Sequence, residues 1–566
     1  MPAAKCWILT ETAGDLIFSG HGQAEGLQAS QLQRANKMNS NRYLVKNIRL
    51  GVGEDIGALR KRAAKVLKIK ESDIKDISLV KRSLDARKKN DIHYVCSAAV
   101  TAGNALNAEL YEEIAYGIPK VSFHGLRPVI AGFGPAGMFA GLVLSKAGLM
   151  PLILERGGTV EERTEKVEAF RKGEAPLDAE CNVQFGEGGA GTFSDGKLNT
   201  GTHDSRISWV LRQFYEHGAQ ESILYDAKPH IGTDILCRVV KSIREDIISN
   251  GGEILFNSKL ESINIQNGSV CSVTVSRGDE KIGIPCEKLI LATGHSSRDT
   301  FEMLKSKNVP MARKGFSMGV RVEHRQEDVN AAQYGEAPPE GLPAADYSAN
   351  AHFEDGTSAY TFCMCPGGKV IAAASEEGGV CTNGMSDSKR DAENANSAIL
   401  VTLSPEDFPG DDVLAGVYWQ REIERKAYLY AGKDYKAPVQ KVGDFLDNTA
   451  STGPGRVRPS YEPGVYWGDI RQVLPARITE VLEKAIPEFS KRLAFFRDPD
   501  AVLTCPEARS SSPVRILRDE NCESGLKGLY PCGEGAGYAG GITSAAVDGM
   551  RCAEKVILSL LREKDV

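Results

Sequence analysis

Glycines at the spacing of a dinucleotide-binding turn are the first residues in this sequence whose pattern predicts chemistry. G-x-G-x-x-G occurs three times, and the first copy (Gly132, Gly134, Gly137) lies between a short apolar run and a helix-like run. Such a turn presents backbone N–H groups and a helix N-terminus to a pyrophosphate, and its second glycine leaves room for the phosphates. We predict that these glycines, with Pro135 and Ala136 between them, contact a dinucleotide.

An acidic residue completes this fingerprint. Glu155 ends the next apolar run, at about the 20-residue distance where an acid can accept hydrogen bonds from an adenosine ribose. We include its neighbour Arg156 in the predicted site.

The other two copies differ in context. Gly186, Gly188 and Gly191 follow no clear strand and indicate a loop, which either wraps a cofactor through its backbone N–H groups or is a flexible surface segment. On the first interpretation, the contacts are Gly188, Gly189, Gly191, Thr192, Ser194 and Lys197. The third copy (Gly535, Gly537, Gly540) lacks a following acid and predicts no second nucleotide-binding domain.

Composition places the chain among ordinary globular proteins. It has 566 residues, 42% hydrophobic and 25% charged, with a net charge of −6, which excludes a fibrous or mainly disordered chain. The 13 cysteines include no C-x-x-C, and no metal-ligand spacing occurs, so we predict reduced thiols and no metal. Without an apolar run of about 18 residues or a secretory signal, we expect a soluble cytoplasmic protein with no membrane contact.

Periodicity predicts an α/β architecture in parts. Residues 1–40 lack periodicity and indicate a poorly ordered extension, in which Met38 is an alternative start. Residues 41–125 predict a small α+β module of order β-α-β-β. Residues 126–310 and 500–566 predict a discontinuous Rossmann-like domain, and 311–499 an inserted β-rich substrate or cap domain with strands and long loops.

The N-terminal module is basic, with 16 Lys and Arg against 10 Asp and Glu over residues 41–125. Such an excess of positive charge either marks the binding of an acidic partner or RNA, or belongs to an ordinary solvent-exposed surface. Since no aromatic RNA-binding motif accompanies the charge, we do not expect a nucleic-acid partner.

Several segments together resemble a known family. RPVIAGFGPAGMFAGLVLSKAG, NVQFGEGGAGTFSDGKL, LILATGHSSRDTF, YTFCMCPGGKV and GLYPCGEGAGYAGGITSAAVDG are similar to the bacterial uncharacterised FAD-dependent dehydrogenases, within the p-hydroxybenzoate-hydroxylase-like FAD oxidoreductase superfamily. The resemblance implies a Rossmann-like FAD-binding fold and FAD as cofactor. It further implies contacts at Thr293 and Gly294, at Gly533 and Glu534, and at Gly540, Gly541 and Ile542, which would begin the last helix and face the flavin pyrimidine.

Candidates for catalysis are fewer. Lys197 is a cation near the expected flavin, and His230 and His295 lie in loops near the cofactor, where each is either an acid–base group or a packing residue. Arg509 precedes a serine-rich turn and is either a clamp for a substrate carboxylate or part of an interdomain loop. Cys363 and Cys365 would share one strand face and are interpreted as core cysteines, because a disulfide two residues apart in a strand is strained. Cys532, beside Gly533, is a weaker redox candidate.

The predicted reaction is hydride transfer between a small organic substrate and FAD. A flavin monooxygenase is one alternative, and an RNA- or protein-binding flavoprotein with a structural or sensing FAD is another. NAD(P)H remains a possible reductant, without a dedicated second Rossmann site.

Overall fold

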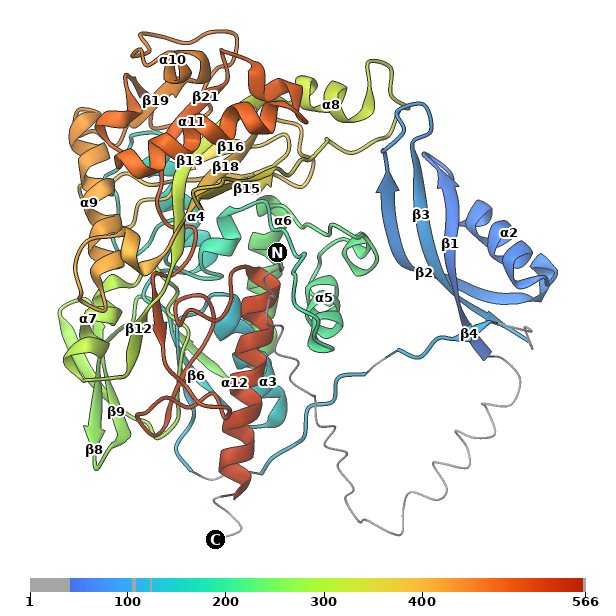
Figure 1. Cartoon of the computed structure of the whole chain (residues 1–566). Helices are drawn as coiled ribbons and strands as arrows, with labels where there is room; N and C mark the ends of the chain where they lie inside the picture. The colour runs from blue at the N-terminus through green and yellow to red at the C-terminus, as the bar shows by residue number, and fades with distance from the viewer. Residues whose placement is uncertain (1–40, 104–107, 114, 123–124, 563–566) are drawn as a thin grey trace, which may run out of the picture.

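The computed structural model describes residues 41–103, 108–113, 115–122 and 125–562. The predicted N-terminal extension and Met38 lie outside the described residues. Figure 1 shows the described chain as a main body with a separate small sheet beside it.

A five-stranded parallel sheet lies at the centre of the nucleotide-binding part. Its order is β23-β11-β5-β6-β7, and the bounds are β5 (Val129–Ala131), β6 (Leu152–Leu154), β7 (Glu253–Leu255), β11 (Leu289–Leu291) and β23 (Leu529–Pro531). Parallel strands covered on both faces are apolar throughout, which is why the sequence showed short continuous apolar runs here. The Rossmann-like α/β fold is confirmed.

The two faces of this sheet have different covers. Ile130 and Ile290 pack with the helices α3 (Pro135–Ala147), α5 (Arg206–Glu216), α6 (Thr233–Ser249) and α12 (Ile542–Arg562). Their neighbours Val129 and Leu289 pack instead against an antiparallel meander. The meander consists of β8 (Lys259–Gln266), β9 (Ser269–Arg277) and β10 (Glu280–Pro285). Alternate side chains of each strand therefore serve two cores.

A seven-stranded mixed sheet forms the second layer of the main body. Its order is β14-β15-β18-β13-β21-β19-β20, with β13 (Phe316–Arg325), β14 (Asn350–His352), β15 (Ser358–Cys365), β18 (Asn394–Leu403), β19 (Ala437–Lys441), β20 (Val465–Trp467) and β21 (Val502–Glu507). The boundary predicted at residue 499 separates β21 from this sheet, although β21 pairs with β13 and β19. The sheet therefore continues to residue 507.

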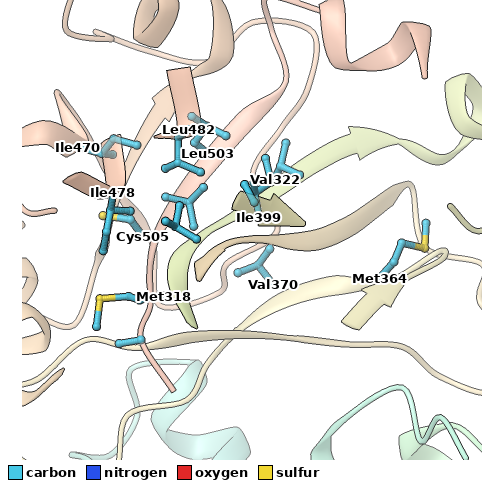
Figure 2. Packing of buried hydrophobic residues seen from close by; sticks show 14 of the residues in the cluster. Met318, Val322, Met364, Val370, Ile399, Ile470, Ile478, Leu482, Leu503 and Cys505 are labelled. Carbon is cyan, nitrogen blue, oxygen red and sulfur yellow. The ribbon is translucent and has the colours of Figure 1, made fainter. Parts of the chain in front are cut away.

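Helices cover this second sheet, although the sequence had suggested mainly strands and loops. They are α8 (Gln326–Tyr334), α9 (Ala415–Tyr430), α10 (Val442–Leu446) and α11 (Ala476–Ser490). Figure 2 shows Ile478 and Leu482 of α11 with Val322 of β13 and Leu503 of β21 in one buried cluster. Each of these side chains is at most 2% exposed.

Short elements connect the layers. They are α4 (Val160–Arg171), α7 (Arg298–Ser306), the pair β12 (Met311–Arg313) with β22 (Val514–Ile516), and the pair β16 (Lys369–Ala372) with β17 (Thr382–Met385).

The N-terminal module has the predicted order of elements. It contains β1 (Asn41–Gly51), α2 (Ile56–Leu67), β2 (Ile74–Asp85), β3 (His93–Ala102) and a short edge strand β4 (Glu109–Leu110), in the sheet order β2-β3-β1-β4. Asp55 caps α2 by accepting hydrogen bonds from the N–H groups of Gly57 and Ala58. In Figure 1, α2 lies on the side of this sheet that points away from the main body.

Candidate functional site

The first two glycine motifs lie against each other. The Gly188 N–H donates to the Phe133 carbonyl over 2.8 Å, and a Cβ built on Gly189 would stand 2.9 Å from the Gly134 Cα. The second motif is therefore neither a Rossmann turn nor a free surface loop. It packs over the dinucleotide turn, which favours a loop that wraps the cofactor over a flexible surface segment.

The first turn has the shape that a pyrophosphate needs. A Cβ on Gly132 would lie 2.4 Å from the Ala292 carbonyl oxygen, and one on Gly137 would lie 1.9 Å from the Gly132 carbonyl oxygen. Both glycines are thus required by backbone packing. Gly134 differs, since a Cβ there would meet only the Gly189 Cα, at 3.6 Å. The free space above Gly134, at the N-terminus of α3, fits the pyrophosphate of FAD.

Glu155 lies where the sequence placed it, but its carboxylate already has partners. It accepts hydrogen bonds from the N–H groups of Phe133 (2.8 Å), Gly157 (3.0 Å) and Gly186 (2.9 Å). A carboxylate has about four acceptor positions. One therefore remains for a ribose hydroxyl, fewer than the two that a ribose diol would use.

A cavity of about 570 Å³ runs from this turn to the seven-stranded sheet. Most residues predicted to contact the cofactor line it: Gly132, Gly134, Pro135, Ala136, Glu155, Arg156, Gly189, Gly191, Ser194, Lys197, Thr293, Gly294, Gly533, Glu534, Gly540, Gly541 and Ile542. Three predicted contacts, Gly137, Gly188 and Thr192, are not among the lining residues. Gly137 packs beneath the turn, and the Thr192 hydroxyl donates to the Glu187 carbonyl inside the loop.

The last helix begins at the predicted place. The helix α12 starts at Ile542, after Gly540 and Gly541, and all three residues line the cavity. A Cβ on Gly191 would lie 3.0 Å from Ile542 Cγ1, so the wrapping loop and the start of α12 are adjacent. The positive end of the α12 dipole therefore points to this part of the cavity.

Charged side chains gather on the cavity wall around Lys197. Its Nζ lies 2.8 Å from Asp195 Oδ2, and Arg390 Nε donates to Asp195 Oδ1 over 2.9 Å. Burial alone would raise the pKa of Asp195, but Lys197 and Arg390 outweigh burial and lower it. Asp195 is thus an anion that holds two cations in place.

The two histidine candidates separate. His295 lines the cavity, and its Nδ1 lies 3.7 Å from Glu534 Oε2. His230 is not among the lining residues, and its Nε2 lies 3.4 Å from the Ser388 carbonyl oxygen. Burial, and then Arg390, lower the pKa of His230. The structure therefore supports His295 and not His230 as a group that could exchange a proton with a bound molecule.

Arg509 is not a free clamp for a substrate carboxylate. Its Nε and Nη2 donate to Glu424 over 2.7 and 2.6 Å, and Arg298 Nη2 donates to the same carboxylate over 2.8 Å. The Arg509 side chain is 3% exposed. It lines the cavity, but its guanidinium is committed to an internal ion pair.

Five charged residues of the cavity lining were not predicted from the sequence: Asp195, Lys228, Asp346, Arg390 and Glu507. Arg390 is paired with Asp195, 195 positions away in the chain, a distance that leaves no signal in the spacing. Glu507 also lines the cavity, and burial raises its pKa to about 7, although Arg321 Nε donates to it over 3.1 Å. Its position two residues before Arg509 on the same strand end could have identified it.

Within the part of the chain that the structure describes, no helix is both long and apolar enough to cross a bilayer, and no cluster of three or more candidate metal ligands occurs.

Comparisons with known proteins agree with this geometry. Residues 315–510 match the family model described as "FAD-dependent protein, C-terminal domain-like", and residues 45–101 match a domain of unknown function, DUF8436. A Clostridium beijerinckii protein, itself uncharacterised, is 47% identical over 530 residues, which cover 91% of this chain and 98% of that protein.

Similarity to solved structures is weaker. The flavin-dependent brominase Bmp2 aligns with a TM-score of 0.35 at 12% identity, over 77% of this chain and 79% of that one. The FAD complex of the Bacillus halodurans glycerol-3-phosphate dehydrogenase aligns with a TM-score of 0.36 at 12% identity, over 78% and 65% of the two chains. Likenesses at this level carry no argument about the reaction. The near full-length relative shows the family: the chain belongs to the same family as the Clostridium beijerinckii protein. Its residues 315–510 match the model of an FAD-dependent protein, and its cofactor is FAD.

Proposed function

We propose that the protein is an FAD-dependent oxidoreductase that transfers a hydride between a small organic substrate and flavin N5. The observation that carries this proposal is that the dinucleotide turn, the start of α12 and the end of the seven-stranded sheet all line one and the same cavity. When bound, FAD supplies the hydride chemistry, and the protein supplies position and field.

Residues of the chain have separable roles in this proposal. Gly134 and the N-terminus of α3 hold the pyrophosphate, and Glu155 holds one ribose hydroxyl. The start of α12 stabilises negative charge at the flavin pyrimidine, because a helix N-terminus carries about half a positive charge. His295 and Glu507 are positioned on the wall to exchange a proton with the substrate.

The proposed partner is a small molecule rather than a nucleic acid. The cleft beside the basic N-terminal module has a volume of about 1730 Å³ and is lined by six acidic and four basic side chains. Such a mixed lining does not favour a polyanion.

The test is photoreduction of the purified protein without oxygen, followed by reoxidation with a panel of small organic acceptors. We expect at least one acceptor to reoxidise the flavin anaerobically, in a saturable reaction that yields the two-electron-reduced acceptor. A protein that is reoxidised by oxygen alone, with hydroxylation of an added compound, would be a monooxygenase. A flavin that no acceptor reoxidises would contradict the oxidoreductase proposal.

A further inference from the structure

The two cysteines at the end of β15 do not lie in a regular strand. The register of β15 with β18 shifts between Phe362 and Cys365, and Cys363 has a φ of 43°. This bulge turns the chain between the two cysteines. Cys363 is partly exposed and lines the cavity, whereas Cys365 is fully buried behind it. The prediction of two core cysteines is therefore wrong for Cys363.

The bulge is held by a buried arginine. Arg321 is fully buried, and its Nη1 and Nη2 donate to the Cys363 carbonyl over 3.2 and 3.3 Å. The same Nη1 lies 3.9 Å from Cys365 Sγ, and Cys365 Sγ donates to the Cys363 carbonyl over 3.3 Å. One cation thus fixes the backbone of the first cysteine and the sulfur of the second.

The charges around the two sulfurs favour one thiolate. The side-chain contact with Cys365 lowers the pKa of Cys363. Burial opposes this shift, and Lys197 and Arg321 add to it. Asp195 acts in the opposite direction but is already paired with Lys197 and Arg390. For Cys365, the hydrogen bond to Cys363 and burial both raise the pKa. A partly exposed cysteine with a lowered pKa beside a buried thiol is the arrangement of an attacking and a resolving cysteine.

We propose that Cys363 and Cys365 form a dithiol–disulfide couple that exchanges two electrons with the FAD bound in the same cavity. This couple goes beyond the proposed hydride transfer, because it stores a second electron pair in the protein chain itself.

The exchange between the two cysteines and FAD balances in atoms and electrons, and oxygen then returns the flavin to its starting state. The Cys363 thiolate and the Cys365 thiol form one sulfur–sulfur bond and lose two electrons and one proton. FAD takes up those two electrons and one proton and becomes the reduced anion. Dissolved oxygen then reoxidises the reduced flavin to FAD, with hydrogen peroxide as product. The reverse step, from reduced flavin to the disulfide, restores the two cysteines.

Geometry does not prevent such a bond. A disulfide needs the two Cα atoms within about 7 Å, and residues two apart span at most about 7 Å even in a fully extended chain. The strain expected for this spacing assumes a regular strand, whereas the positive φ at Cys363 bends the chain.

An electron count tests the proposal on the holoprotein. After complete reduction and reoxidation in air, the wild-type protein is titrated anaerobically with dithionite. We expect four electrons per FAD, two for the flavin and two for the disulfide. Cys363→Ser and Cys365→Ser should each take two. Cys271→Ser, at a partly exposed cysteine on β9 that does not line the cavity, should still take four.

A second readout does not depend on the flavin. Trypsin releases residues 326–369 as one peptide that contains these two cysteines and no other. After reoxidation and treatment with iodoacetamide, this peptide should carry no alkyl group and be two hydrogen atoms lighter than the dithiol. After reduction it should carry two alkyl groups. The first should be added at Cys363, at a pH well below the usual thiol pKa of about 8.5.

A wild-type protein that takes two electrons, with both cysteines alkylated after reoxidation, would overturn the proposal. Neither readout involves an organic substrate, so this result is independent of whether the proposed function holds. The flavin absorbance of each variant shows that it is folded and loaded.

Discussion

Gly134 and Gly137 belong to one turn but differ in what a side chain would meet. A Cβ at Gly134 has only the Gly189 Cα within 4 Å, and the φ of −79° suits any residue. A Cβ at Gly137 would overlap the Gly132 carbonyl oxygen at 1.9 Å. Gly134 must lack a side chain to leave space for the ligand, whereas Gly137 must lack one so that the backbone can pack.

We therefore expect Gly134→Val to lose bound FAD while the apoprotein unfolds within about 1 kcal/mol of the wild-type apoprotein, the usual cost of a poor N-cap residue. Gly137→Ala should lower the stability of the apoprotein itself, because backbone must move. The ratio of flavin to protein absorbance and urea unfolding of both apoproteins measure the two effects. A Gly134→Val protein that purifies with its full flavin content would contradict the assignment of the turn.

For single residues, the sequence predicted which side chains lie in the site better than it predicted the groups that they bind. Glu155 was found from its distance to the turn, but two of its three backbone donors, Phe133 and Gly186, come from segments that only folding brings to it. For Arg509, a substrate clamp and an interdomain loop both stayed open, because its partner Glu424 lies 85 positions earlier, with nothing local to indicate a pair. A charged residue near a ligand loop looks the same in sequence whether its partner is a substrate or a distant side chain.

Among the elements, α9 contributes a buried carboxylate that joins two layers. Glu424 of α9 lies between Arg298 of α7 and Arg509 after β21, and all three side chains are at most 3% exposed. Burial would raise the pKa of Glu424, but the two arginines outweigh burial and lower the pKa to about 2.

We expect Glu424→Gln to destabilise the protein by about 3–5 kcal/mol at pH 7, since it leaves buried arginines without their anion. A depressed pKa stabilises the folded state above the unfolded value of 4.5, and this contribution is lost as the pH falls from 4.5 toward 2. Urea unfolding between pH 7 and pH 3 should therefore show the difference from wild type shrinking with acid. The exposed Glu520→Gln is the control, and a pH-independent difference would argue against this role.

The start of α12 makes a prediction about the flavin. Ile542→Asp places a carboxylate where the helix dipole is positive, whereas Ile542→Asn keeps the shape without the charge. Two unit charges about 4 Å apart interact by about 4 kcal/mol at an effective dielectric of about 20. A quarter of that would lower the two-electron potential by roughly 20 mV, since 30 mV corresponds to about 1.4 kcal/mol. Dye-equilibration potentiometry decides, and equal potentials for both variants with FAD bound would show that α12 does not face the flavin.

Elements of regular pattern were predictable, and those with buried polar residues were not. The strands of the parallel sheet and α3, α6 and α12 follow uniform apolar runs or clear helical periodicity. The helix α9 was missed because its inner face buries Gln420 and Glu424, which break the apolar repeat. In α11, Pro487 lies inside the helix and resembles a loop signal.

For the whole molecule, the number of parallel sheets limits how a nicotinamide could bind. The described residues contain one five-stranded parallel sheet with one fingerprint turn, and the seven-stranded sheet is mostly antiparallel. We expect NADH and NADPH to reduce the flavin slowly and without saturation at low micromolar concentration. Stopped-flow reduction that saturates there would show a dedicated nicotinamide site.

The N-terminal module contacts the main body through the edge of β2. The Arg82 N–H donates to the Tyr225 carbonyl over 2.7 Å, and the Ala227 N–H donates to the Arg82 carbonyl over 2.9 Å. The Arg82 guanidinium forms a double hydrogen bond with Asp226, at 2.7 and 3.0 Å, and lies over the rings of Tyr94 and Tyr225. The sequence predicted the module but not this contact, since it joins segments 144 positions apart.

Arg82→Gln keeps the backbone contact and removes the ion pair. The two side chains are 32% and 27% exposed, so the pair contributes about 1 kcal/mol at most to docking. That loss would let the module open about fivefold more often, because a factor of ten corresponds to about 1.4 kcal/mol. The Ala227 amide, remote in sequence from the substitution, should exchange its hydrogen about fivefold faster. Arg87→Gln removes an exposed pair with Asp85 inside the module and should leave the Ala227 rate unchanged. Equal Ala227 rates in Arg82→Gln and wild type would mean that the backbone contact alone holds the module in place.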